Sequence, residues 1–236
     1  MNKAVTDGLT LTPPEFSDGL DVWSRGDGTA GSTTYDGAAD AALVTADADF
    51  AGCLELQKTE TTQSLRYMGE TPILPGCYPQ VTARIKAISG AFPTVRIAGY
   101  AGLPGGGPVP GVVLTGPSVT PDTYGEVVTV RAIVGTGSRT GVDMAWGTQA
   151  SFGHFGIDLT GPDGGVVRVD DIRIEDVTYF FHRKLMDWVD VRDYGAVGDG
   201  VTDDRAAFVA ADAAADGRQV LVPDRGIFEE FGKGSG

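Results

Sequence analysis

The chain is poor in the residues that most metal, redox and hydrolase sites require, because its 236 residues include only two histidines and two cysteines. Cys53 and Cys77 fit none of the usual metal-binding or redox spacings, and we expect two reduced thiols rather than a disulfide. No His/Cys cluster suggests zinc, and neither His154 nor His182 accompanies a nucleophile-elbow sequence. The sequence therefore does not indicate a zinc enzyme or a serine hydrolase.

Basic residues are also scarce: 18 Lys and Arg stand against 32 Asp and Glu, which leaves a formal net charge of −14. A nucleic acid or an anionic membrane requires a basic face on its partner, so we expect neither partner. No hydrophobic run reaches the length of a membrane-spanning helix, and the opening residues MNKAVTDGLTLTPPEF lack the apolar core of a signal peptide. We therefore expect no membrane insertion and no export by the general secretory route.

Turn-forming residues are abundant by contrast, with 35 Gly and 13 Pro. Between the turns, short segments alternate apolar and polar residues, as at Val81, Ala83 and Ile85, which share one face of a strand. One extra residue interrupts the last alternating segment, and we predict a β-bulge at Asp170–Asp171. Many short strands separated by turns predict a mainly β protein with a jelly-roll β-sandwich over residues 16–178.

The segments around the sandwich have a different composition. Residues 1–15 are expected to form an N-terminal arm, and the aromatic, charge-mixed residues 179–190 a short helix or an extended linker. Residues 191–236 contain the one convincing helix of the sequence, which is rich in alanine and follows several capping candidates. A short buried strand is expected after this helix, over Gln219–Pro223.

The last segment reads YGAVGDGVTDD from Tyr194, then an Ala-rich helix, then VLVP from Val220. This order resembles the entry motif of the pectate-lyase-like parallel β-helix superfamily, matched here from Val191 to Phe228. The resemblance implies a helix that caps the first strand of a parallel β-helix and covers its open edge. In such proteins the catalytic carboxylates lie on later coils, so no catalytic residue is expected here. The implied turn and helix-capping residues are Gly198, Asp199, Gly200, Thr202, Asp203 and Asp204.

Two other stretches, EFSDGLDVWSR near the start and VVRVDDIRIEDV near the end of the sandwich, are similar to the first and last strands of jelly-roll carbohydrate-binding modules. Such modules often hold a structural calcium through a Glu just after the first Phe and an Asp of the last strand. Here Ser17 follows Phe16, which departs from that pattern. The resemblance implies a structural calcium ion held by Glu15 or Asp18 together with Asp171.

A sandwich joined to a β-helix entry resembles a phage tailspike or the head spike of a gene transfer agent. The resemblance implies a place on the surface of a virion or phage-like particle assembled in the cytoplasm, with other spike or capsid proteins as partners. We also expect a homo-oligomer, a trimer first and a pentamer second. The strand edge at Val220–Val222 and the aromatic segment beside His182 would otherwise face water.

Sugar recognition uses aromatic faces framed by a few polar groups. Trp146 is the strongest candidate, because Gly147 follows it and the sequence GHFG lies just beyond. Taken one at a time, Trp23, Trp146, Phe152 and Phe155 are each expected to pack in the core more readily than to bind sugar, and Trp146 is the best exception. The predicted sugar-binding side chains, in expected loops or at strand ends, are Trp146, His154, Phe155, Tyr100 and Tyr124.

Three functions remain open from the sequence. The favoured one is a non-catalytic spike or adhesin subunit that binds, or anchors a binder of, host cell-surface polysaccharide. The second is a polysaccharide lyase or hydrolase whose catalytic coils lie outside this chain. The third is a purely structural connector of a phage-like particle.

Overall fold

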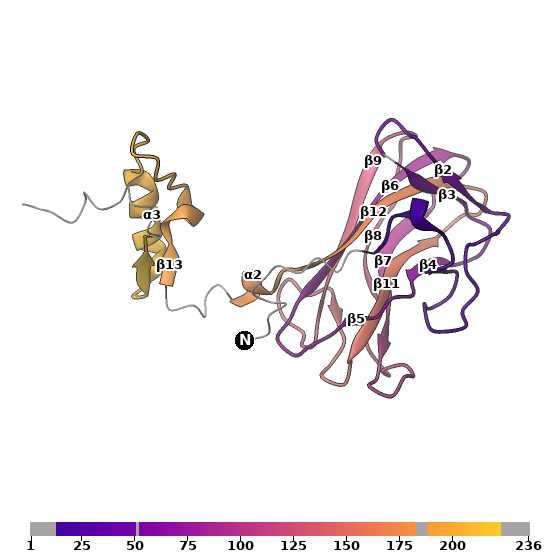
Figure 1. The fold of residues 1–236 in the computed structure, drawn as a ribbon, viewed down its shortest axis with the longest axis horizontal. Helices are drawn as coiled ribbons and strands as arrows, with labels where there is room; N and C mark the ends of the chain where they lie inside the picture. The colour runs from indigo at the N-terminus through magenta and orange to yellow at the C-terminus, as the bar shows by residue number, and fades with distance from the viewer. Residues whose placement is uncertain (1–12, 51, 183–187, 223–236) are drawn as a thin grey trace, which may run out of the picture. The chain divides into compact units, whose positions relative to one another are not determined.

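The computed structural model describes residues 13–50, 52–182 and 188–222 (Figure 1). It divides the chain into two compact units, Met1–Tyr179 and Phe180–Gly236, which are described separately below. The first part of the expected N-terminal arm, and the part of the β-helix motif from Pro223 to Phe228, lie outside the described residues. Within the described ranges no helix is long and apolar enough to cross a membrane.

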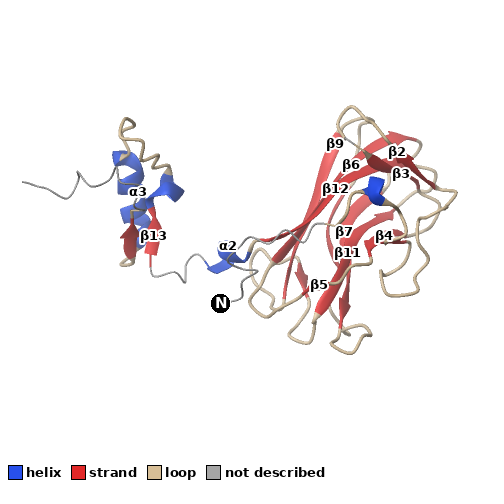
Figure 2. Ribbon diagram, in the orientation of Figure 1, coloured by secondary structure: helices blue, strands red, loops and turns tan. Residues whose placement is uncertain are grey.

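The first unit is a sandwich of two β-sheets (Figure 2), which confirms the predicted mainly β sandwich. The first sheet has the order β1-β4-β11-β7-β8, with β5 paired to β11, and the second has the order β10-β9-β6-β12-β3-β2. All pairings are antiparallel except that of β10 with β9. The bounds are η1 Phe16–Asp18, β1 Trp23–Ser24, β2 Ala41–Val44, β3 Cys53–Gln57, β4 Gln63–Tyr67, β5 Thr71–Pro72, β6 Pro79–Ser89, β7 Thr94–Gly102, β8 Thr115–Val119, β9 Val127–Gly135, β10 Met144–Ala145, β11 Phe152–Thr160, β12 Val166–Asp176 and α2 Thr178–His182.

The core lies between the two sheets and follows from the alternation of the strands. On β6, Val81, Ala83 and Ile85 are fully buried and belong to one cluster with the apolar side chains of β11 and β12. Burial of this apolar area is the main favourable contribution to folding. Cys53 and Cys77 are free thiols, as expected, and burial raises the pKa of Cys53 to about 11.

The predicted bulge in β12 is confirmed. The register with β6 shifts between Asp170 and Arg173, and Asp171 has a positive φ of 50°. The extra residue lets Ile172 and Ile174 return to the core side, where both are buried.

Ion pairs hold a short segment between β2 and β3 against the side of the second sheet that faces away from the core. Asp47 accepts hydrogen bonds from Lys86 and Arg168, and its side chain is 3% exposed while that of Lys86 is 5% exposed. The hydrogen bond from Lys86 is the largest cause that holds the pKa of the Asp47 carboxyl well below its ordinary value. The ring of Phe50 lies beneath the Lys86 ammonium, 5.1 Å from ring centroid to Nζ.

The second unit contains one helix packed on a pair of strands. Ala207, Ala211 and Ala215 of the helix form a buried stripe against Val189 and Val191. Alanine at this spacing allows close approach between helix and strand. The two strands pair in parallel, and the bounds are β13 Trp188–Asp190, η3 Val191–Tyr194, α3 Arg205–Ala215 and β14 Gln219–Leu221.

The aspartates of the entry motif accept backbone hydrogen bonds in the turn that leads into α3. Gly198 and Gly200 have positive φ values of 64° and 75°, a conformation that favours glycine. The expected buried strand after the helix is wrong as to burial, because Gln219 and Leu221 of β14 are exposed. Whether the unit begins a parallel β-helix remains a prediction. The hydrogen bonds are those from Val201, Thr202 and the Thr202 hydroxyl to Asp199, from Arg205 to Asp203, and from Val197 and Gly198 to Asp204.

Candidate functional site

Strand β11 turns one side to the core and the other side away from the second sheet. On its core side Phe155, Ile157 and Leu159 are fully buried. The register with β7 places Tyr100 opposite His154, Ala98 opposite Gly156 and Arg96 opposite Asp158. Because side chains alternate along each strand, these pairs share the side that faces away from the core. We call this side of β4, β11 and β7 the outer face; its residues are Ser64, Arg66, Arg96, Ala98, Tyr100, Phe152, His154, Gly156 and Asp158.

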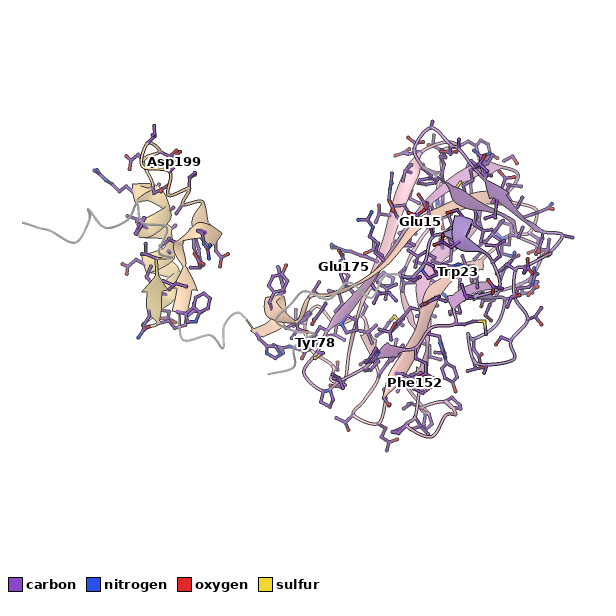
Figure 3. The ribbon with its side chains drawn as sticks, in the orientation of Figure 1. Glu15, Trp23, Tyr78, Phe152, Glu175 and Asp199 are labelled. Atoms are coloured by element: carbon purple, nitrogen blue, oxygen red, sulfur yellow. The ribbon has the colours of Figure 1, made fainter. Side chains whose placement is uncertain are left out.

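One end of the outer face carries three rings in mutual contact. The centroid of Tyr100 lies 6.3 Å from that of Phe152 and 5.8 Å from that of His154, and the last two are 5.5 Å apart and edge to face. Phe152, labelled in Figure 3, lies flat against Gly102, where an added Cβ would fall 2.1 Å from its ring. Phe152 is half-buried and lines a pocket of about 270 Å³ together with Glu70, Pro72, Pro104, Gly106 and Ser151.

A polar loop between β1 and β2 borders these rings. Asp27 in this loop accepts hydrogen bonds from the backbone N–H and the hydroxyl of Thr29, and Gly28 packs on His154 so closely that an added Cβ would lie 2.6 Å from the histidine Cβ. Burial, and then the charge of Asp27, raise the pKa of Tyr100. The loop also forms an open, polar hollow of about 660 Å³, lined by residues 25–27 and 29–33 with Glu60.

The other end of the outer face is charged. The buried carboxylate of Asp158 accepts hydrogen bonds from Arg66 at 2.6 Å, from the Ser64 hydroxyl at 2.9 Å and from Arg96 at 3.3 Å. Burial alone would raise the pKa of Asp158, but the charge and hydrogen bond of Arg66 outweigh it and the pKa is lowered. Asp158 is therefore ionised between two guanidinium groups, and the cluster as a whole is positive.

The strongest sugar-binding candidate from the sequence, Trp146, is wrong. Its side chain is fully buried, stacks on Phe155 with centroids 5.0 Å apart, and donates a hydrogen bond from Nε1 to the Val113 carbonyl at 2.8 Å. Phe155, also predicted, is equally buried on the core side of β11. Neither ring can contact a ligand, because both lie between the sheets.

The other three candidates separate into two places. Tyr100 and His154 lie together on the outer face, next to Phe152, which the sequence reading placed in the core. Tyr124 lies elsewhere, 51% exposed and stacked on Phe92 with centroids 4.6 Å apart. The alternation of β11 could have identified Phe152 from the sequence. Phe152 is an even number of residues from His154 and Asp158 and therefore lies on their side of the strand, whereas Phe155 lies on the opposite side.

The calcium site predicted at Glu15 or Asp18 with Asp171 stays a prediction. Glu15 and Asp171 do line one pocket of about 220 Å³, but Asp18 is not part of that lining. The two carboxylate oxygens of Asp171 accept hydrogen bonds from Arg84 and Arg173, each at 2.9 Å. Two guanidinium groups thus already neutralise the carboxylate that a cation would need. Across residues 13–50, 52–182 and 188–222 no group of three His, Cys, Asp or Glu side chains could hold a metal ion.

No protein-family model matches the sequence, and no curated protein matches it. Among solved structures, the CBM22-1 xylan-binding domain of Paenibacillus barcinonensis Xyn10C aligns with a TM-score of 0.45 and 12% identity over 72% of this chain and 96% of that domain. A xylan-binding domain from CBM 22 aligns with a TM-score of 0.46 and 12% identity over 72% of this chain and 94% of that one. The enzymatically active domain of bacteriophage CBA120 tailspike protein 4 aligns with a TM-score of 0.37 and 12% identity over 58% of this chain, which spans 18% of that domain.

Proposed function

We propose that the sandwich binds polysaccharide on the outer face of its first sheet and that the chain does not cleave it. The observation that supports this best is the cluster of Tyr100, Phe152 and His154, on the same face as the charged group around Asp158. Phe152 also lines a pocket to which Glu70 and Ser151 contribute polar groups. Aromatic faces cover the apolar side of a sugar ring, and fixed polar groups orient its hydroxyls. His154 and Asp158 are four residues apart on β11, about 14 Å along a strand, so the face suits an extended chain.

We further propose that the chain is a spike or adhesin subunit of a phage-like particle, in which the second unit mediates assembly. The entry motif before α3 and the parallel pairing of β13 with β14 support this part of the proposal. A sheet of two short parallel strands presents backbone N–H and C=O groups at its edges. Strands of neighbouring chains or of further coils could form hydrogen bonds with these groups.

The binding proposal is tested with Phe152→Ala, because this ring is half-buried and rests on Gly102 rather than in the core. Loss of a stacking contact of about 1–3 kcal/mol should weaken polysaccharide binding roughly tenfold to a hundredfold. The matched control is Tyr124→Ala, which removes an exposed ring away from the outer face and should leave the affinity unchanged. Affinity electrophoresis against a panel of bacterial capsular polysaccharides measures both variants, and equal effects would contradict the proposal.

The enzyme alternative requires a separate measurement. The chain is incubated with polygalacturonate and with each polysaccharide that it binds, and the products are assayed for new reducing ends and for unsaturated sugars. We expect neither. If the chain cleaved a polysaccharide and a substitution on the outer face abolished the cleavage, the chain would be a lyase or hydrolase instead of a binding protein. If the chain bound no polysaccharide, the structural connector would be favoured.

A further inference from the structure

The charged end of the outer face carries more positive than negative charge. Arg66 and Arg96 share one carboxylate, Asp158, so the three groups together carry one net positive charge. The chain as a whole has a formal net charge of −14, so the charge of this cluster is opposite in sign to that of the protein. Because the overall negative charge repels anions at long range, an anionic ligand at this site would have to be held by short-range contacts.

The two arginines differ in the length of their ion pair with Asp158 and in their exposure to solvent. Arg66 is buried, and its ion pair with Asp158 at 2.6 Å is short. Arg96 reaches the same carboxylate at the longer distance of 3.3 Å, and its side chain is 30% exposed. Within the described part of the chain, the Nε atoms of both arginines are buried and have no hydrogen-bond partner. The exposed part of the Arg96 side chain therefore lies beyond Nε, toward the end of the guanidinium group.

Arg96 has a charged neighbour on one side and neutral polar neighbours on the other. Its cross-strand neighbours are Asp158 on β11 and Ser118 on β8, and Ser118 is exposed. Close by, the hydroxyls of Thr94 and Thr120 lie 2.7 Å apart on the exposed edge of the sheet. A guanidinium group presents a planar set of donors that matches a carboxylate in a bidentate pair, and such pairs are among the stronger hydrogen-bonded contacts.

We propose that the ligand is an acidic polysaccharide and that Arg96 selects it by pairing with a sugar carboxylate. This inference rests on the proposed binding function and adds the ligand class and the residue that determines it. The ring of Phe152, supported by Tyr100, then contacts one sugar unit while Arg96 contacts the carboxylate of another, about 14 Å farther along the strands. Arg66 and Asp158 position Arg96 and do not themselves contact the ligand.

The test compares each acidic polysaccharide with the same polymer after its carboxyl groups are reduced to alcohols. Alginate, hyaluronan, polygalacturonate and acidic capsular polysaccharides serve as probes, and affinity electrophoresis gives the dissociation constants. The wild-type chain should bind the acidic forms about tenfold or more tightly than the reduced forms, in line with a charge-assisted hydrogen-bonded contact. Arg96→Gln should abolish this preference while Asp158 keeps its bonds to Arg66 and Ser64, so the variant should melt as the wild type does.

Two variants make the result specific. Arg131→Gln removes the same charge from an exposed position of β9 in the second sheet and should preserve the preference. Phe152→Ala should weaken binding to the acidic and the reduced forms by the same factor. Equal binding of acidic and reduced forms by the wild type, or equal effects of Arg96→Gln and Arg131→Gln, would overturn the role of Arg96 and leave the binding function intact. Binding to neither form of any probe would overturn both proposals.

Discussion

Replacing Trp146 by alanine should unfold the sandwich more easily and should not act on ligand binding directly. The indole is fully buried, stacks on Phe155, and is enclosed by Gly99 and Gly153, where added Cβ atoms would fall 2.9 Å and 2.6 Å from its ring. Large-to-small changes of a buried Trp cost about 3–5 kcal/mol, and the Val113 carbonyl loses its donor as well, about 1 kcal/mol. For a unit of this size, each kcal/mol lowers the melting temperature by about 2–4 °C, so we expect a fall of roughly 8–24 °C.

The assay pairs thermal melting with affinity electrophoresis below the melting transition. Trp146→Phe is the graded control, because it keeps an aromatic ring against Phe155 and removes only volume and the N–H donor; it should lose about half as much stability. Per folded molecule, all three proteins should bind polysaccharide equally. If Trp146→Ala melted within about 3 °C of the wild type and lost binding, the core position of this ring, and with it the assignment of the two sides of β11, would be refuted.

Three further outcomes are expected. Asp47→Asn leaves Lys86 with only the more exposed Asp49 as an ion-pair partner and should cost about 1–3 kcal/mol in chemical denaturation, more than the loss in a Lys86→Met, Asp47→Leu double variant. Because the folded-state pKa of Asp47 is depressed, its contribution to stability is complete above the unfolded pKa near 4 and is lost as the pH falls below that value. If the double variant lost stability in acid to the same extent as the wild type, this role of Asp47 would be contradicted. Calcium or a chelator should move the melting temperature by less than about 1 °C, since Arg84 and Arg173 already neutralise Asp171. A saturable rise of the melting temperature with calcium would instead show that the ion binds to the folded chain. Light scattering should find a trimer, or a pentamer second, at micromolar concentration, and a monodisperse monomer would contradict both.

The two-sheet architecture was predictable from the sequence because alternation is a local property. Val81, Ala83 and Ile85 show the core face of β6 without any knowledge of its neighbours, and the phase shift at Asp170–Asp171 shows the bulge. Which strands pair is a different matter. That β11 lies between β4 and β7 depends on contacts between residues far apart in the chain, and no periodicity encodes them.

The candidate site was only half predictable for the same reason. Tyr100 and His154 were identified as aromatic residues near strand ends, but their juxtaposition comes from the β7–β11 register. The glycine after Trp146 suggests a loop, and the residue does follow the end of the short strand β10, but the indole itself points into the core. The calcium prediction depends on charges from other strands that the sequence does not place: Arg84 of β6 reaches Asp171 across the sheet.

The outer face combines stability with recognition, and this determines where its function can be probed. Tyr100, His154, Arg66 and Asp158 are each less than one-tenth exposed, so their removal would disturb packing or leave a buried charge unpaired. Phe152 and Arg96 are the members that combine partial exposure with fixed neighbours on β7 and β11. A ligand that contacts these two side chains meets groups already held in place by strand pairing and by Asp158, so little conformational entropy is lost on binding. The buried members of the face thus support affinity by preorganising the two exposed ones, and the effects of Phe152→Ala and Arg96→Gln on binding should be additive, since the two side chains lie at opposite ends of the face.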